Sequence, residues 1–271
     1  PPVIINDFED ETTGFLLSNS NSKVYSAFKF ETLPQYNIFG QKSIKYYYDF
    51  VRSDKLPAGT YMMTNPGGNT EPMYIKDYPE KLGLWVYGDG SGVSLRSIIT
   101  DANNTQKVLI YGTVNFVGWN YMEAPVPKDL ALPLYVKVPF NIVSAADKKT
   151  KGSLWFDRLR AVYTPIVGED YQAPVMTKSY PAEGKIITQR KPEINLLLTD
   201  NVSIDPKTIK LTVNGYTIPD GGGVKYESGA TGRVKYQVKN NLKNGRHTIQ
   251  IFVRDTFGNP LFKTITFEVR A

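Results

Sequence analysis

Short segments in which apolar and polar side chains alternate follow one another along the whole of this chain. The first part contains nine of them, at residues 23–31, 43–51, 60–65, 81–89, 93–100, 107–114, 120–126, 134–143 and 153–163. They are rich in Tyr, Phe, Val and Ile, and clusters of Gly, Pro, Asn and Asp separate them. Because successive side chains of a strand point to opposite faces, and no convincing helical period is found, the pattern predicts an all-β sandwich.

A second series of strands follows a predicted domain junction. Residues 164–174, TPIVGEDYQAP, contain two prolines, a glycine and two acids, a composition typical of a domain junction. Seven short strands are then predicted at 174–181, 192–200, 208–215, 224–228, 232–238, 246–255 and 262–270, which suits an immunoglobulin-like sandwich. We therefore expect a first domain at 1–164, a linker at 165–173 and a second domain at 174–271.

Composition excludes several classes of chemistry. The chain has no cysteine, so disulfides, thiol nucleophiles, Cys-ligated zinc and iron–sulfur clusters are impossible. The single histidine, His247, rules out a multi-His zinc site, and at the start of a predicted strand it is expected to be structural. No apolar run approaches the ~20 residues that a spanning helix needs, so no membrane insertion is expected.

Positive charge is concentrated in the second domain. Residues 174–271 contain 15 Lys and Arg against 8 Asp and Glu, whereas residues 1–164 contain 17 against 16. The basic side chains are scattered along strands rather than massed in a run, so nucleic-acid binding is not expected. An anionic cell-wall polymer or acidic polysaccharide is one partner to consider, and a merely solvated basic surface is the alternative.

One carboxylate stands out in the last strand of the first domain. In GSLWFDRLRAVY, strict alternation places Asp157 on the same face as Trp155, Leu159, Ala161 and Tyr163. A buried carboxylate without a partner either takes up a proton or finds a cation. The sequence therefore raises the question of which group accompanies Asp157.

Several strings together resemble a known kind of module. NDFEDETTGF, FGQKSIKYYYDF, KLGLWVYGDGSGVSLRSIITDANNT, VGWNYMEAPVP and GSLWFDRLRAVY resemble successive blocks of jelly-roll, galactose-binding-like modules related to carbohydrate-binding modules. The version they resemble most is appended to bacterial phosphodiester glycosidase proteins, relatives of N-acetylglucosamine-1-phosphodiester alpha-N-acetylglucosaminidase. This resemblance covers residues 5–163. KPEINLLLTDNVSIDPKTIKLTVNG and NGRHTIQIFVRDTFGN resemble bacterial Ig-like repeats.

The resemblance implies a jelly roll followed by an Ig-like domain in an extracellular or cell-surface protein. It further implies a non-catalytic accessory region of a larger secreted bacterial protein, a phosphodiester glycosidase. We expect this region to bind polysaccharide or cell-wall glycan. Because no edge strand is marked for pairing with a partner, a monomer is expected. No block resembles a catalytic domain, and no spacing singles out a pair of carboxylates for glycoside hydrolysis. The alternative is a structural spacer of a surface or S-layer protein without a sugar site.

The resemblance also implies a structural calcium ion. The first and last strands of a jelly roll meet, so Glu9 and Asp7 are expected to approach Asp157 and to supply oxygen ligands to Ca²⁺. These modules usually have two acids in the last strand, whereas here Arg158 follows Asp157. The alternative is a carboxylate held by hydrogen bonds, with Lys42 or Arg158 as its counter-ion.

Aromatic residues are the candidates for sugar contact, because the apolar C–H face of a pyranose ring stacks on an aromatic face. Alternation in LGLWVYGD separates Leu82, Leu84 and Val86 from Trp85 and Tyr87, and one of the two sides must be core. The sequence does not decide which side that is. The predicted carbohydrate-binding residues are Trp85, Tyr87, Trp119, Tyr121 and Tyr47, with Arg96 as a polar contact; core packing of the rings is the alternative.

Overall fold

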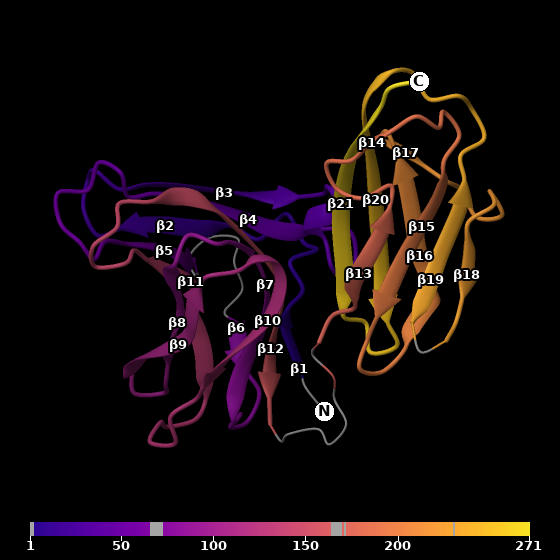
Figure 1. The fold of residues 1–271 in the computed structure, drawn as a ribbon. Coiled ribbons are helices and arrows are strands. Elements are labelled where there is room, and N and C mark those ends of the chain that lie inside the picture. Colours follow the sequence, from indigo (N-terminus) through magenta and orange to yellow (C-terminus); the bar gives the residue numbers. More distant parts are fainter. Residues whose placement is uncertain (1–2, 66–72, 164–169, 171, 230) are drawn as a thin grey trace. The chain divides into compact units, whose positions relative to one another are not determined.

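The computed structural model describes residues 3–65, 73–163, 170, 172–229 and 231–271 of the chain (Figure 1). The chain divides into two compact units, Pro1–Val167 and Gly168–Ala271. Within the described residues the regular structure is β apart from a short 3-10 turn at Pro34–Tyr36, so the all-β prediction is confirmed. Most of the predicted linker at 165–173 lies outside the described residues, and no helix in the described part is long and apolar enough to cross a membrane.

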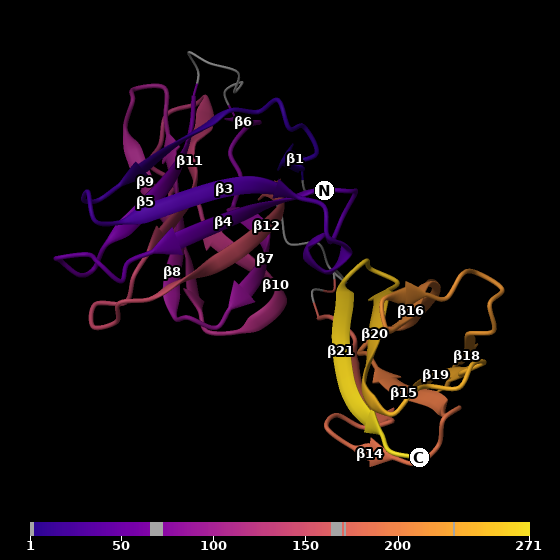
Figure 2. The same cartoon turned by 90° about the horizontal axis from the view of Figure 1, so that it is seen from above.

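The first unit consists of two six-stranded sheets (Figures 1 and 2). One sheet, called here the β12 sheet, has the order β10 (Val117–Pro125), β7 (Lys81–Asp89), β12 (Lys151–Val162), β4 (Ser43–Asp49) and β3 (Tyr25–Glu31), with β1 (Val3–Asn6) paired to β12. The other, the β11 sheet, has the order β2 (Phe15–Asn19), β5 (Gly59–Thr64), β11 (Leu134–Val143), β8 (Val93–Thr100) and β9 (Gln106–Val114), with β6 (Met73–Ile75) paired to β11. All nine predicted strands are present, and β1, β2 and β6 were not predicted.

The core of the first unit lies between these sheets. Leu82, Leu84 and Val86 are fully buried in it, which identifies the core side of β7. The rings of Phe140 in β11 and Phe156 in β12 stack at 3.9 Å across the two sheets. Burial of each such side chain contributes about 1.5–3 kcal/mol. Trp85 and Tyr87 consequently lie on the outer face of the β12 sheet, meaning the face turned away from the core.

The prediction that Asp157 shares a face with Leu159 and Ala161 is wrong. The pairing of β12 with β7 shifts between Asp157 and Arg160, and Arg158 adopts a left-handed backbone with φ of 50°. This bulge adds one residue, so Leu159 and Ala161 face the core while Asp157 lies on the outer face with Trp155. The Asp157 carboxylate therefore lies outside the core, on the outer face of the β12 sheet, where residues 38 and 39 contact it.

The second unit contains a four-stranded and a five-stranded sheet. The four-stranded sheet has the order β13 (Val175–Tyr180), β15 (Glu193–Thr199), β19 (Gly232–Gln237) and β18 (Lys225–Glu227). The five-stranded sheet has the order β14 (Ile186–Ile187), β21 (Pro260–Val269), β20 (Gly245–Asp255), β16 (Ile204–Val213) and β17 (Tyr216–Thr217). All seven predicted strands are present, and β14 and β17 were not predicted. Alternate residues such as Leu196, Val234 and Ile251 are fully buried between the sheets.

Candidate functional site

The segment 32–42 lies over the outer face of the β12 sheet and is fixed there by aromatic rings. Tyr36 stacks on Trp155 with ring centres 3.9 Å apart and planes 3° from parallel. It also meets Tyr87 edge-on at 4.9 Å. The indole Nε1 of Trp119 donates a hydrogen bond to the carbonyl oxygen of Gln35 at 3.1 Å. These contacts make the segment part of a second, smaller packed layer outside the main core.

Four of the predicted sugar-binding residues belong to this aromatic layer. Trp85 is only 5% exposed, with Phe39 and Tyr121 packed against it at ring distances of 6.0 and 5.5 Å. Tyr87, Trp119 and Tyr121 are half-buried beside it. Because Trp85 is buried among neighbouring side chains, its ring presents no open platform to a ligand in the structure. Sugar contact by the four rings stays a prediction.

The predicted contact residue Tyr47 lies in a different position on the same face. It points outward from β4 and, with Ala27, Phe28, Lys29 and Lys45, lines an open hollow of about 250 Å³. The hollow is smaller than the roughly 300–1,000 Å³ of typical small-molecule sites.

Asp157 and Glu9 are brought to one corner by the same stretch of backbone. The amides of Ile38 and Phe39 donate to Oδ2 of Asp157 at 3.1 and 3.0 Å. The amides of Gln41 and Lys42 donate to Oε1 of Glu9 at 2.9 and 3.1 Å. Between them, Gly40 has a φ of 65°, and any side chain there would overlap the Glu9 carboxylate. This carboxylate corner, formed by Glu9, Asp157 and residues 38–42, follows from the pairing of β1 with β12.

One carboxylate oxygen of the corner has no hydrogen-bond partner among the described residues. It is Oδ1 of Asp157, which is fully buried. Burial raises the pKa of Asp157 to about 7, although the two backbone donors and Arg158 act in the opposite direction. Lys42 Nζ pairs instead with Glu11 at 3.2 Å, and the Arg158 guanidinium lies 3.8 Å above the ring of Phe39. Neither cation forms an ion pair with Asp157 in the described part of the chain.

The carboxylate oxygens of the corner are of the kind that a hard cation could bind. Two carboxylates present oxygens that the four amides do not use, and one of these oxygens is buried and has no partner among the described residues. Oxygen ligands of this kind suit Ca²⁺. Asp7 is less well placed, since its Oδ1 accepts the amide of Glu9 at 3.2 Å, and it does not form a close group of three with Glu9 and Asp157.

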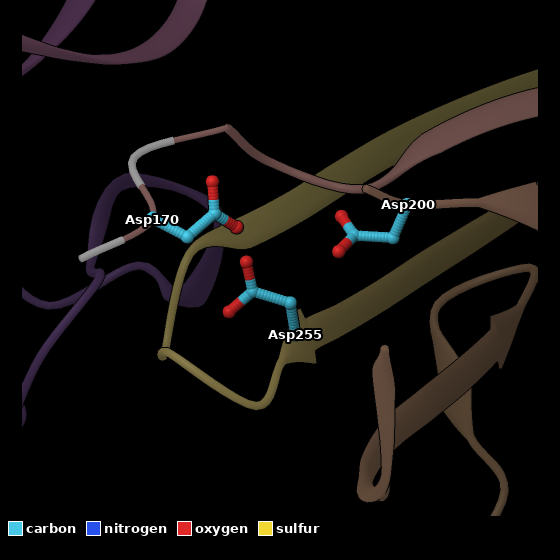
Figure 3. Close-up of side chains that lie close together, drawn as sticks. All are labelled: Asp170, Asp200 and Asp255. Carbon is cyan, nitrogen blue, oxygen red and sulfur yellow. The ribbon is translucent and has the colours of Figure 1, made fainter. Parts of the chain in front are cut away.

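A close group of three carboxylates lies in the second unit (Figure 3). Asp170, Asp200 and Asp255 point toward one another, with one oxygen of each within 4.8 Å of the others. Asp255 is 2% exposed and accepts the side-chain amide of Asn259 at 2.6 Å. No local pattern in the sequence predicts this group, which the strand ends at 200 and 255 bring together. Its oxygens could hold a divalent cation.

The three carboxylates differ in their tendency to hold a proton. Burial raises the pKa of Asp200, and the neighbouring charges of Asp255 and Asp170 add to this. Burial likewise raises the pKa of Asp255. Burial would also raise the pKa of Asp170, but hydrogen bonds from the Asn201 side chain and the Gln172 amide outweigh it and lower that pKa. Mutual repulsion of this kind is what a bound cation or a shared proton would relieve.

The outer face of the β11 sheet has a row of side chains that crosses five of its six strands. Strand pairing places Ser18, Tyr61, Asn141, Arg96 and Ile110 side by side, in the order β2, β5, β11, β8, β9. We call this set the β11 row. Of its members only Arg96 was predicted as a contact residue. The structure places Arg96 on the opposite sheet from the predicted aromatic residues, so these do not form one site.

The β11 row combines apolar surface with polar groups that form few hydrogen bonds among the described residues. Arg96 Nε donates to Ser94 Oγ at 3.1 Å, the one hydrogen bond of its guanidinium among the described residues. Asn141 is 4% exposed, and its Oδ1 has no partner in the described chain. Within the row Ile110 is 54% exposed, and Tyr74, which pairs with Tyr135 farther along β11, is 64% exposed. The described part of the sheet is thus an open, amphipathic face.

Sequence reasoning missed Tyr61 and Asn141, although both lie in predicted strands. A signal was present, since Asn141 interrupts the apolar run VPFNIV just as Asp157 interrupts its own strand.

The prediction of a structural histidine agrees with the geometry. His247 is 8% exposed, and its Nδ1 and Nε2 meet the Asn214 side chain at 2.9 Å and the Lys243 carbonyl at 2.8 Å.

Comparison with known proteins finds structural likeness only. No protein-family model matches the sequence. No curated protein matches it either. The family 11 carbohydrate-binding module of a cellulosomal cellulase of Clostridium thermocellum is 10% identical, with a TM-score of 0.41 over 60% of this chain and 95% of the module. A C-terminal family 22 carbohydrate-binding module of the same organism is 14% identical, with a TM-score of 0.30 over 58% of this chain and 98% of the module.

A longer enzyme also has similar structure. The β-1,2-glucanase of Parabacteroides distasonis is 10% identical, with a TM-score of 0.40 over 99% of this chain, which spans 39% of the glucanase. Similarity at this level assigns no family to the chain. Its function has to be inferred from its own residues.

Proposed function

We propose that the first unit is a non-catalytic carbohydrate-binding module whose sugar site is the outer face of the β11 sheet. The observation that carries this proposal is the β11 row, in which a tyrosine, an amide, a guanidinium and an aliphatic side chain lie on adjacent strands. Residues on paired strands are held more rigidly than residues on loops, so such a row is organised before a ligand arrives.

The chemistry of the β11 row matches that of a sugar. A pyranose ring has an apolar C–H face and a rim of hydroxyl groups. Tyr61 and Ile110 supply apolar surface, and the half-buried Arg96 supplies hydrogen-bond donors, while the buried amide of Asn141 lies between Tyr61 and Arg96 in the row. Because the described face is open rather than enclosed, it suits a length of polysaccharide lying across the strands.

We further propose that Glu9 and Asp157 hold a structural calcium ion. The buried Oδ1 of Asp157, which has no partner among the described residues, and the Oε2 of Glu9, which accepts none of the four amides, support this assignment. When bound, the ion would neutralise the two carboxylates and strengthen the attachment of residues 38–42 to β12. The protein's own part is to orient both carboxylates through four backbone amides.

We propose that the region serves a larger secreted bacterial protein, with the second unit as an Ig-like spacer. Support comes from the resemblance of residues 5–163 to modules appended to phosphodiester glycosidase proteins and of the later strings to bacterial Ig-like repeats. In this account the catalytic residues belong to another part of that protein.

A glycan array probed with the full chain tests the proposed function. Tyr61→Ala and Arg96→Gln are expected to weaken binding of a positive glycan about tenfold or more, because each removes a contact of about 1–3 kcal/mol. Tyr47→Ala, on the other sheet, is the matched control and should bind normally. Melting temperatures of the three variants should stay close to that of the unchanged chain.

Two outcomes would contradict the proposal. Loss of binding in Tyr47→Ala with full binding in Tyr61→Ala and Arg96→Gln would move the site to the β12 sheet. A folded chain that binds no glycan at all would favour the structural-spacer alternative.

A further inference from the structure

The second unit contains a hollow on the outer face of its four-stranded sheet. Its volume is about 470 Å³, within the roughly 300–1,000 Å³ range of small-molecule sites. Side chains of β13, β15 and β19 line it, together with Gln189 from the segment between β14 and β15. Nothing in the proposed carbohydrate site of the first unit involves this hollow.

Strand register fixes the side chains of the hollow. Leu196, Leu198 and Val234 are fully buried in the core of the unit. Their neighbours Asn195 and Arg233 therefore point outward, since side chains alternate across the pleat. Tyr180 is paired with Asn195, which brings the tyrosine beside the amide on the same face. The site is thus built on paired strands.

The polar groups of the hollow are available to a ligand. The Arg233 guanidinium and the Lys178 ammonium form no hydrogen bond or ion pair within the described residues, although both line the hollow. Tyr180 is 42% exposed and donates its hydroxyl proton to Oε1 of Gln189 at 3.0 Å. This bond steadies the ring and leaves the amide nitrogen of Gln189 as a donor.

We infer that this hollow binds a sugar residue that has a carboxylate, a uronate unit of an acidic glycan. Tyr180 offers a ring for the apolar face of the sugar, and Gln189 and Asn195 offer amides to its hydroxyls. The planar guanidinium of Arg233 can donate two parallel hydrogen bonds to a carboxylate. Two cations against one acid, Glu193, favour an anionic over a neutral sugar.

The charge of the whole unit agrees with this choice. Residues 174–271 contain 15 Lys and Arg against 8 Asp and Glu, so an acidic polymer is attracted to the surface before it finds the hollow. A nucleic acid is the less suitable occupant, because the hollow offers one aromatic ring rather than a series of stacking platforms.

Isothermal titration of the full chain with oligogalacturonate and oligomannuronate tests the inference. One of the two is expected to bind, and the methyl ester of the same oligosaccharide is expected to bind at least tenfold more weakly. Arg233→Gln should weaken binding of the acidic form about tenfold, and Tyr180→Ala should weaken it severalfold. Glu193→Gln should strengthen it, because the substitution removes the one negative charge from the lining.

Two control variants complete the experiment. Lys225→Gln removes one positive charge from the same sheet outside the lining and should leave affinity unchanged. Arg96→Gln should also leave it unchanged, which separates this hollow from the β11 row. The inference is overturned if neither uronate binds, if the ester binds equally well, or if Arg233→Gln has no more effect than Lys225→Gln.

Discussion

At the scale of the residue, Asp157 shows how a short irregularity changes the meaning of a sequence. The alternation of its strand predicts a carboxylate beside Leu159 in the core. The bulge at Arg158 moves Asp157 to the other face, where residues 38 and 39 supply two amides. Full burial then raises the pKa of Asp157 from its usual value near 3.8 to about 7.

This pKa has a consequence for stability in the presence of a chelator. Between pH 4 and pH 7 the folded state retains the Asp157 proton, while the unfolded chain has lost it. The free energy of unfolding should therefore fall as pH rises, by about 1.4 kcal/mol per pH unit and by ~4 kcal/mol at most. Urea titrations of the unchanged chain and Asp157→Asn check this, since the variant should lose that slope.

Calcium is expected to reverse this pH dependence, so that stability increases rather than decreases as pH rises. A bound cation favours the ionised carboxylate, so in millimolar Ca²⁺ the melting temperature should rise with pH from 5 to 7. Asp157→Asn should abolish the gain, and Asp200→Asn, in the acidic group of the other unit, should preserve it. A calcium effect lost in Asp200→Asn and retained in Asp157→Asn would assign the ion to the second unit instead.

At the scale of the element, segment 32–42 is a packed cover rather than a loop in solvent. It occupies the aromatic layer of the β12 sheet, so the rings that the sequence offers as sugar platforms serve to hold it. Trp85→Ala should lower the free energy of unfolding by about 3–5 kcal/mol, as for other buried tryptophans. Tyr47→Ala, at an open hollow, should lower it far less.

Denaturant unfolding of these two variants measures the difference. Equal stability of Trp85→Ala and the unchanged chain, together with lost glycan binding, would show that Trp85 is a sugar contact after all. Large destabilisation in Trp85→Ala alone is the result expected from its packing.

Strands were largely predictable because alternation is a local property of the sequence. The bounds of β7, β8 and β11 match the predicted segments residue for residue. The site was less predictable, because it depends on which face of each sheet stays uncovered. Segment 32–42 decides that for the β12 sheet, and its contacts with Trp155 and Trp119 join residues about 80–120 positions apart. Three aspartates at 170, 200 and 255 likewise meet only through the fold.

At the scale of the whole molecule, the two units are expected to bind different kinds of glycan residue. The first has nearly balanced charge and an open amphipathic sheet face, while the second contains most of the excess positive charge. A neutral or weakly charged part of a polysaccharide suits the β11 row, and an acidic part suits the hollow at Arg233.

The central claim is that the β11 row binds carbohydrate. NMR titration of the full chain with a glycan selected on the array tests it most directly, because backbone amide shifts locate the contact without any substitution. The account predicts shifts concentrated at Tyr61, Arg96 and Asn141 and their strand neighbours. Shifts confined to residues 32–42 and Tyr47, with the β11 sheet unaffected, would contradict it.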